Sequence, residues 1–166
     1  MKGKWAAGIP PRRFTWIIKD SLAMSERPGG FGESHRKVRR QEEIIWLRQQ
    51  GFNLIVSVLP GRNNLQHYEE EGVNAAHFPM PETGDITEHL RVCYAALDEA
   101  RQGSGRVLIH ADDLGDRLMG VVAGYVSTIS DQLTANQAIH FVEQLVERPM
   151  SPEGREIVRA IDPPKA

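Results

Sequence analysis

The chain has 166 residues and a formal net charge of −2, with 40% hydrophobic and 25% charged residues. These values are typical of one globular domain and provide no basic field of the kind that nucleic-acid binding requires. No apolar run reaches the ~18 residues of a transmembrane helix, so we expect no membrane partner. The single cysteine, Cys93, permits no internal disulfide. Together with the lack of a signal-peptide pattern, it predicts a cytoplasmic location.

Residues 1–12 contain two adjacent prolines and predict a loose N-terminal arm, whereas residues 13–162 predict a single domain. Aromatic and β-branched residues predict a strand over 14–18, which resumes over 22–25 after a turn. The following elements are expected to be a helix over 34–50, a strand over 53–59, a helix over 64–71 and a strand over 73–78.

The second half of the chain is predicted to be mostly helical, with helices over 85–101, 118–129, 134–149 and 151–161. Asp85 and Glu88 have capping-box spacing, as do Thr134 and Gln137. A short apolar strand over 107–109 precedes the helix at 118. Strands that alternate with helices predict an α/β fold. Its central sheet should be mostly parallel, with about four to five strands and helices on both faces.

The chain is organised around residues 107–129, which read as a strand, a polar loop from His110 to Asp116 and a buried helix. Loops at the carboxyl ends of parallel strands are the usual ligand sites of such sheets. The first N–H groups of a helix lack internal acceptors, and the helix dipole favours negative charge there. The sequence therefore predicts an anion-binding loop.

This loop resembles the signature of the cysteine-dependent protein tyrosine phosphatases and dual-specificity phosphatases: a strand, His-Cys, five residues, Arg and a helix. His110 and Arg117 stand at the matching positions, with five residues between Ala111 and Arg117. The nucleophile position is Ala111, and Leu118 stands where the family usually has serine or threonine. Gly115 lies one place later than the usual loop glycine.

The resemblance covers about residues 13–148 and implies the dual-specificity phosphatase fold. It also implies that His110 shapes the loop by hydrogen bonding to backbone. Glu82 stands at the general-acid position, and Asp85 is a second candidate for that role. Because the thiol and the hydroxyl that acts on it are both missing, the cysteine mechanism is expected to be absent.

We therefore expect a catalytically inactive phosphatase-like protein that recognises a phosphorylated or anionic small molecule, or a phosphoprotein. The residues expected to bind it are His110, Ala111, Asp112, Asp113, Leu114, Gly115, Asp116 and Arg117. Arg117 offers a bidentate fork to an oxyanion, or alternatively pairs with a loop aspartate and fastens the loop. The aspartates oppose phosphate by ~1–4 kcal/mol per close pair. They would not do so if they pointed outward or if Asp113 or Asp116 capped the helix.

Two other functions remain open. A phosphoric monoester hydrolase without cysteine chemistry would use Asp112 as nucleophile or a metal-activated water. No cofactor is expected, but a divalent metal would find hard or borderline ligands in His110, Asp112, Asp113 and Asp116. The third reading is a scaffold whose former site is closed by a network between Arg117 and the aspartates.

Overall fold

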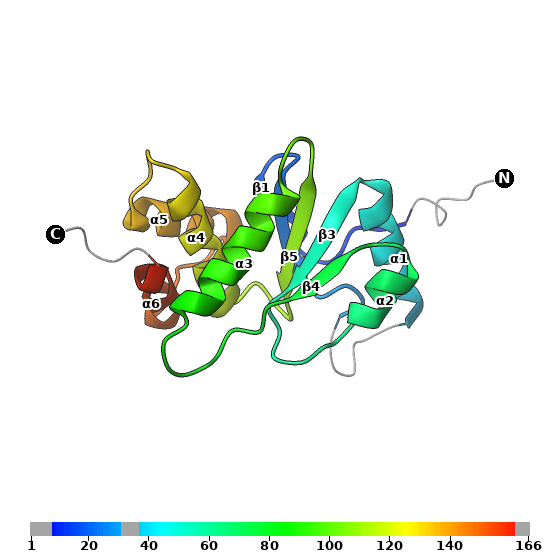
Figure 1. Ribbon diagram of the computed structural model, residues 1–166, viewed down its shortest axis with the longest axis horizontal. Coiled ribbons are helices and arrows are strands. Elements are labelled where there is room, and N and C mark those ends of the chain that lie inside the picture. Colours follow the sequence, from blue (N-terminus) through cyan, green and yellow to red (C-terminus); the bar gives the residue numbers. More distant parts are fainter. Residues whose placement is uncertain (1–7, 31–36, 162–166) are drawn as a thin grey trace.

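The centre of the molecule is a five-stranded sheet in the order β1-β2-β5-β3-β4. It is seen in a computed structural model that describes residues 8–30 and 37–161 (Figure 1). The strands are β1 (Thr15–Ile18), β2 (Leu22–Glu26), β3 (Phe52–Ser57), β4 (Ala75–His77) and β5 (Arg106–Ala111). β1 and β2 are antiparallel, and every other neighbouring pair is parallel. The predicted α/β class and mostly parallel sheet are confirmed.

The central strand β5 is buried on both faces, because its side chains alternate between two hydrophobic cores. Leu108 belongs to the smaller core, together with residues of α1 (Lys37–Gln49) and α2 (Leu65–Glu70). Val107 and Ile109 belong to the larger core on the other face. Packing on both faces therefore fixes the position of β5 and, with it, the point at which the chain leaves the sheet after residue 111.

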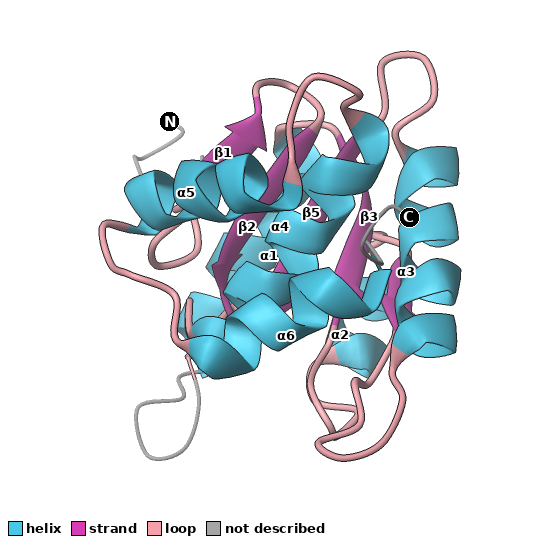
Figure 2. Ribbon diagram, turned by 90° about the vertical axis from the view of Figure 1, so that its left-hand side faces the viewer, coloured by secondary structure: helices cyan, strands magenta, loops and turns pink. Residues whose placement is uncertain are grey.

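Four helices cover the larger core, and Figure 2 shows them on the face opposite α1. They are α3 (Thr87–Ala100), α4 (Asp116–Ile129), α5 (Ala135–Val146) and α6 (Pro152–Ile161). In α4 every residue from Leu118 to Val126 is buried, as its apolar sequence predicts. Among the helices that the structure describes, none is long and apolar enough to cross a membrane.

The helix starts agree with the sequence only in part. The capping box of α5 is confirmed: Gln137 N donates to the Thr134 hydroxyl at 3.2 Å, and Gln137 Oε1 accepts from Thr134 N at 2.9 Å. The predicted box at α3 is wrong, because the N-cap residue there is Ile86. Asp85 instead accepts hydrogen bonds from both the backbone and the hydroxyl of Thr87. The expected start of α1 near residue 34 lies outside the described residues.

The predicted N-terminal arm is described only from residue 8. Pro11 is buried, and the carbonyl of Arg12 accepts a hydrogen bond from Glu26 N at 3.0 Å. The side chain of Arg13 reaches the Val146 carbonyl at 3.0 Å. Residues 11–13 thus pack against the domain and contact β2 and the end of α5.

Candidate functional site

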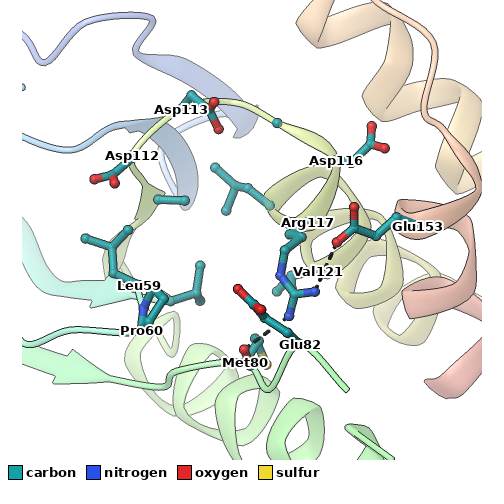
Figure 3. Close-up of a pocket in the computed structure, with 14 residues that line it drawn as sticks. Leu59, Pro60, Met80, Glu82, Asp112, Asp113, Asp116, Arg117, Val121 and Glu153 are labelled. Atoms are coloured by element: carbon teal, nitrogen blue, oxygen red, sulfur yellow. Dashed lines mark hydrogen bonds and ion pairs between the residues drawn. The ribbon is translucent and has the colours of Figure 1, made fainter. Parts of the chain in front are cut away.

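A cavity of about 330 Å³ lies where β5 ends and α4 begins (Figure 3). The strand runs through His110 to Ala111, and the helix starts at Asp116, so the predicted polar loop is shorter than expected at both ends. The apolar part of the lining consists of Val58, Leu59, Pro60, Met80, Ala111, Leu118 and Val121. The charged part consists of Glu82, Asp112, Asp113, Asp116, Arg117 and Glu153.

The cavity holds no side chain suited to nucleophilic attack through sulfur or a hydroxyl. Its lining contains no cysteine, serine or threonine, and Ala111 offers only a methyl group. Leu118, at the position that follows the arginine, is buried in the larger core. Cys93 lies in the same core on α3, and burial raises the pKa of its thiol to about 12. The only thiol of this chain is therefore protonated and away from the cavity.

Arg117 is held by partners that the sequence did not indicate. Its Nη1 lies 3.2 Å from a carboxylate oxygen of Glu153, on α6. Its Nη2 donates to the carbonyls of Met80, at 3.1 Å, and Pro81, at 2.7 Å. The expected pairing of Arg117 with a loop aspartate is wrong, and with it the proposed closed Arg117–Asp network. The arginine instead ties α4 to α6 and to the loop after β4.

The three loop aspartates point to different surroundings. Asp112 lies 3.4 Å from Nε of Arg27, on the loop after β2. Asp116 accepts from Arg148 at 3.0 Å and from Ser151 N at 3.2 Å. Asp113 is exposed and has no ion pair among residues 8–30 and 37–161. The N-cap of α4 is Gly115 with no side-chain cap, so the prediction that Asp113 or Asp116 caps this helix is wrong.

His110 lies inside the sheet and is completely buried, opposite Ser25 on β2 and Ser57 on β3. Its Nε2 is 2.8 Å from the hydroxyl of Tyr68, on α2. Its Nδ1 has no hydrogen-bond partner in the described part of the chain. Burial lowers the pKa of the ring to about 3. His110 is therefore neutral, and its hydrogen bond with the Tyr68 hydroxyl is one that the resemblance did not indicate.

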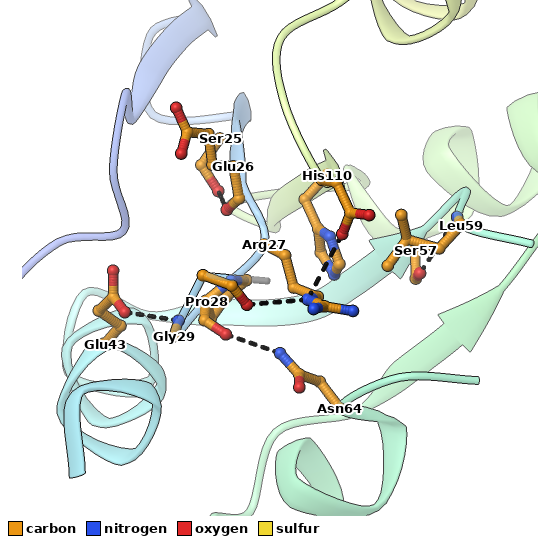
Figure 4. Close-up of polar contacts among 12 residues, drawn as sticks. Ser25, Glu26, Arg27, Pro28, Gly29, Glu43, Ser57, Leu59, Asn64 and His110 are labelled. Atoms are coloured by element: carbon orange, nitrogen blue, oxygen red, sulfur yellow. Dashed lines mark hydrogen bonds and ion pairs between the residues drawn. The ribbon is translucent and has the colours of Figure 1, made fainter. Parts of the chain in front are cut away.

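A buried polar group surrounds this histidine (Figure 4). Asn64 donates to the Tyr68 hydroxyl at 3.3 Å and to the Pro28 carbonyl at 2.7 Å. The phenol hydrogen of Tyr68 is then available to Nε2 of the neutral ring. Arg27, beside His110 in Figure 4, donates from Nε to the carbonyl of Gly30 at 3.0 Å. These contacts fasten the loop after β2 to α2 behind the cavity.

Replacing Tyr68 by phenylalanine is expected to destabilise the fold by ~1–3 kcal/mol, although it removes a single oxygen. The substitution leaves His110 buried with both ring nitrogens unpaired, and that desolvation penalty is not returned elsewhere. Urea unfolding followed by circular dichroism measures the loss. Tyr94→Phe is an unsuitable control, because its hydroxyl is also buried and bonded to the Val121 carbonyl. The exposed substitution Gln66→Ala on the same helix should change stability by less than about 0.5 kcal/mol, and an equal effect of both would contradict the prediction.

The predicted metal ligands are not brought together. In the described part of the chain no three His, Cys, Asp or Glu side chains converge on a point suited to a metal ion. His110 faces the core, while Asp112 and Asp116 approach different arginines. The four residues that share a loop in sequence thus diverge in space.

The two candidate general acids line hollows that border Arg117. Glu82 lines both the cavity and a neighbouring hollow that also borders Glu153, whereas Asp85 lines only the neighbouring hollow. Hydrogen bonds from Thr87 lower the pKa of Asp85, which opposes a role as proton donor. Glu153, Arg27 and Arg148 were missed by sequence reasoning. No local pattern marks them, because each meets its partner through the packing of distant segments.

No family model and no curated protein matches this chain. Solved structures do match. Kinase-associated phosphatase with its catalytic cysteine replaced by serine is 19% identical over 93% of this chain and 98% of that one, with a TM-score of 0.74. Human DUSP28 is 18% identical over 93% and 95%, with a TM-score of 0.65. The human tyrosine phosphatase-like serine/threonine/tyrosine-interacting protein is 12% identical over 91% and 97%, with a TM-score of 0.67. The chain therefore has the fold of the dual-specificity phosphatases.

Proposed function

We propose that this chain is a catalytically inactive phosphatase-like protein that recognises a ligand or partner in the cavity beside residues 111–117. The observation that carries the proposal is Ala111, the last residue of β5, which lines the cavity with a methyl group. Covalent phosphoryl transfer requires a nucleophile at the reacting phosphorus. The retained cavity and the missing nucleophile together favour binding without turnover.

A non-cysteine hydrolase is less well supported. Asp112 is the only acidic neighbour of the nucleophile position in the sequence, and Arg27 holds its carboxylate at 3.4 Å. An ion-paired carboxylate one residue beyond the end of the strand is poorly suited to in-line attack. A metal-activated water would need ligands that converge, whereas Asp112, Asp116 and Glu153 pair with three separate arginines.

A phosphorylated or anionic ligand remains a prediction of the sequence. Arg117 and the first N–H groups of α4 favour it. The carboxylates of the lining oppose it, and Glu153 already occupies one edge of the Arg117 guanidinium at 3.2 Å. An oxyanion would have to displace Glu153 and would bring a second negative charge close to the remaining carboxylates. These contacts therefore favour binding of some ligand or partner in the cavity over binding of a phosphate group in particular.

We expect no turnover of p-nitrophenyl phosphate between about pH 5 and 8, with or without EDTA or added Mg²⁺ and Mn²⁺. The physical reason is that no step can form a phosphoenzyme at Ala111. Release of p-nitrophenol is the measurement, and Arg117→Ala is the control for a contaminating phosphatase. Turnover that disappears in Arg117→Ala would show catalysis in this cavity and would overturn the proposal; turnover unchanged in that variant would come from a contaminant, and repurification removes it.

A further inference from the structure

The cavity described above combines an apolar surface with an excess of carboxylates. Five of its lining side chains are acidic, Glu82, Asp112, Asp113, Asp116 and Glu153, and one, Arg117, is basic. Arg27 and Arg148, which pair with two of these carboxylates, do not line the cavity. The charged side chains that line the cavity therefore carry a net negative charge.

The ion pairs leave two carboxylates without a cation. Arg117 is paired with Glu153, Asp112 with Arg27 and Asp116 with Arg148. Glu82 and Asp113 are exposed and form no ion pair with any described residue. Figure 3 shows them on opposite sides of the opening, Glu82 beside Arg117 and Asp113 on the loop before α4. A positive group placed between them would meet two uncompensated negative charges.

The acidic character continues past Arg117. A second hollow of about 280 Å³ shares Glu82, Arg117 and Glu153 with the cavity. It adds the carboxylates of Asp85 and Glu156 and the apolar side chains of Ile86 and Ile157. The Arg117–Glu153 pair thus borders two adjoining hollows, and both are lined by several carboxylates. A ligand that spans both must be longer than a single side chain.

We propose that these two hollows bind a lysine- or arginine-rich segment of a partner protein. The inference rests on the proposed function, since it names the class of partner recognised at that site. Lysine and arginine side chains lay their aliphatic stems along apolar surface while the charged end reaches polar groups. Here the stem contacts the apolar lining, such as Leu59 and the exposed Pro60, and the charged end lies between Glu82 and Asp113.

Fluorescence anisotropy with a fluorescein-labelled peptide, Gly-Lys-Leu-Lys-Ala-Lys-Gly, tests this proposal at low and at physiological salt. We expect binding that weakens as salt rises, because exposed charges are screened. The same peptide with glutamate for lysine, and O-phosphotyrosine as competitor, are expected not to bind. Tighter binding of phosphotyrosine than of the lysine peptide would overturn the inference and would restore the anionic ligand.

Two double variants distinguish the effect of the carboxylates in these hollows from the effect of the protein's net charge. Glu82→Gln with Asp113→Asn should weaken peptide binding about tenfold, which corresponds to two exposed charge pairs. Glu69→Gln with Glu99→Gln removes the same charge from exposed positions on α2 and α3 and should change binding less than twofold. Equal losses in the two double variants, or no peptide binding at all, would contradict the inference. Neither outcome would affect the proposed lack of turnover, which the p-nitrophenyl phosphate assay tests by itself.

Discussion

Replacement of Gly120 by leucine should destabilise the protein by about 3 kcal/mol, at the upper end of the usual overpacking penalty, or should prevent folding. Gly120 lies on α4 where this helix contacts α6. A Cβ atom there would lie 2.6 Å from the Gly154 carbonyl oxygen and 3.0 Å from Cβ of Ile157. The first of these is a backbone atom, which cannot move away by a rotamer change. The two helices would have to separate.

The contact is reciprocal, which makes a local adjustment more difficult. A Cβ atom on Gly154 would lie 2.7 Å from the Asp116 carbonyl, in the first turn of α4. The same two helices carry Arg117 and Glu153, whose ion pair borders the cavity. Separation of α4 from α6 is therefore expected to reduce peptide binding as well as stability.

Urea unfolding followed by circular dichroism measures the change, with Ala95→Leu as the matched control at an exposed position of α3. The control should change stability by less than about 0.5 kcal/mol. Gly120→Ala tests whether the change in stability is a gain or a loss, because two effects oppose each other at this position. Helix propensity alone favours alanine by about 1 kcal/mol, whereas the contact with Gly154 predicts a loss. A more stable Gly120→Ala protein would show that the helices do not approach as closely as described.

Stability is expected to fall by about 2 kcal/mol as the pH is lowered from about 7 to 5, through His110. Burial lowers the pKa of this ring in the folded protein to about 3, whereas an unfolded histidine has a pKa of about 6.5. Between these values the unfolded chain binds more protons than the folded one. The contribution of His110 is therefore fully present above about pH 6.5 and is lost as the pH falls toward 3.

A second buried group acts in the opposite direction. Burial raises the pKa of Glu43 on α1, despite its short hydrogen bond from Gly29 N at 2.6 Å. Its protonated form is thus favoured by folding, and it offsets part of the loss at low pH. The measurement must therefore isolate His110. The free energy of unfolding is compared at several pH values between wild type and His110→Phe.

The substitution His110→Phe is expected to lower stability at pH 7, because the Tyr68 hydroxyl loses the imidazole nitrogen that accepts its hydrogen. The informative quantity is the slope of stability against pH. We expect the wild-type slope to exceed that of the variant by about 1.1 kcal/mol per pH unit on average between about pH 6.5 and 5, and to approach about 1.4, the value for one proton, near pH 5. Identical slopes would mean that His110 is accessible to protons in the folded protein.

Local sequence patterns were sufficient for the elements that support the site. The apolar run before His110 predicted a buried strand, and the apolar helix that follows predicted burial on most sides. Both are observed, in β5 and in residues 118–126 of α4. The reason is that strand and helix periods are properties of neighbouring residues. Ala111 also followed from sequence, since the missing nucleophile is a matter of residue identity alone.

Sequence patterns were least informative about side-chain partners. Arg117 was expected to bind an oxyanion or a loop aspartate, and it meets Glu153, which is 36 residues away in the chain. Asp112, Asp113 and Asp116 were treated as one group, but packing places Arg27 beside the first and Arg148 beside the last. His110 was assigned to the loop, although it pairs within the sheet. Charged side chains have several oppositely charged candidates along a sequence, and spacing does not select among them.

Residue order alone was enough to predict the α/β class, the strand–loop–helix at residues 107–129 and the missing nucleophile at Ala111. Which carboxylates lack a cation depends on how distant segments pack together. The acidic character of the cavity depends on Glu82 and Asp113 pairing with no cation among residues 8–30 and 37–161, and on the approach of α6 to α4, which brings Glu153 to Arg117. Coulomb energy depends on distance and solvent exposure, and packing sets both quantities here through segments that are far apart in the chain.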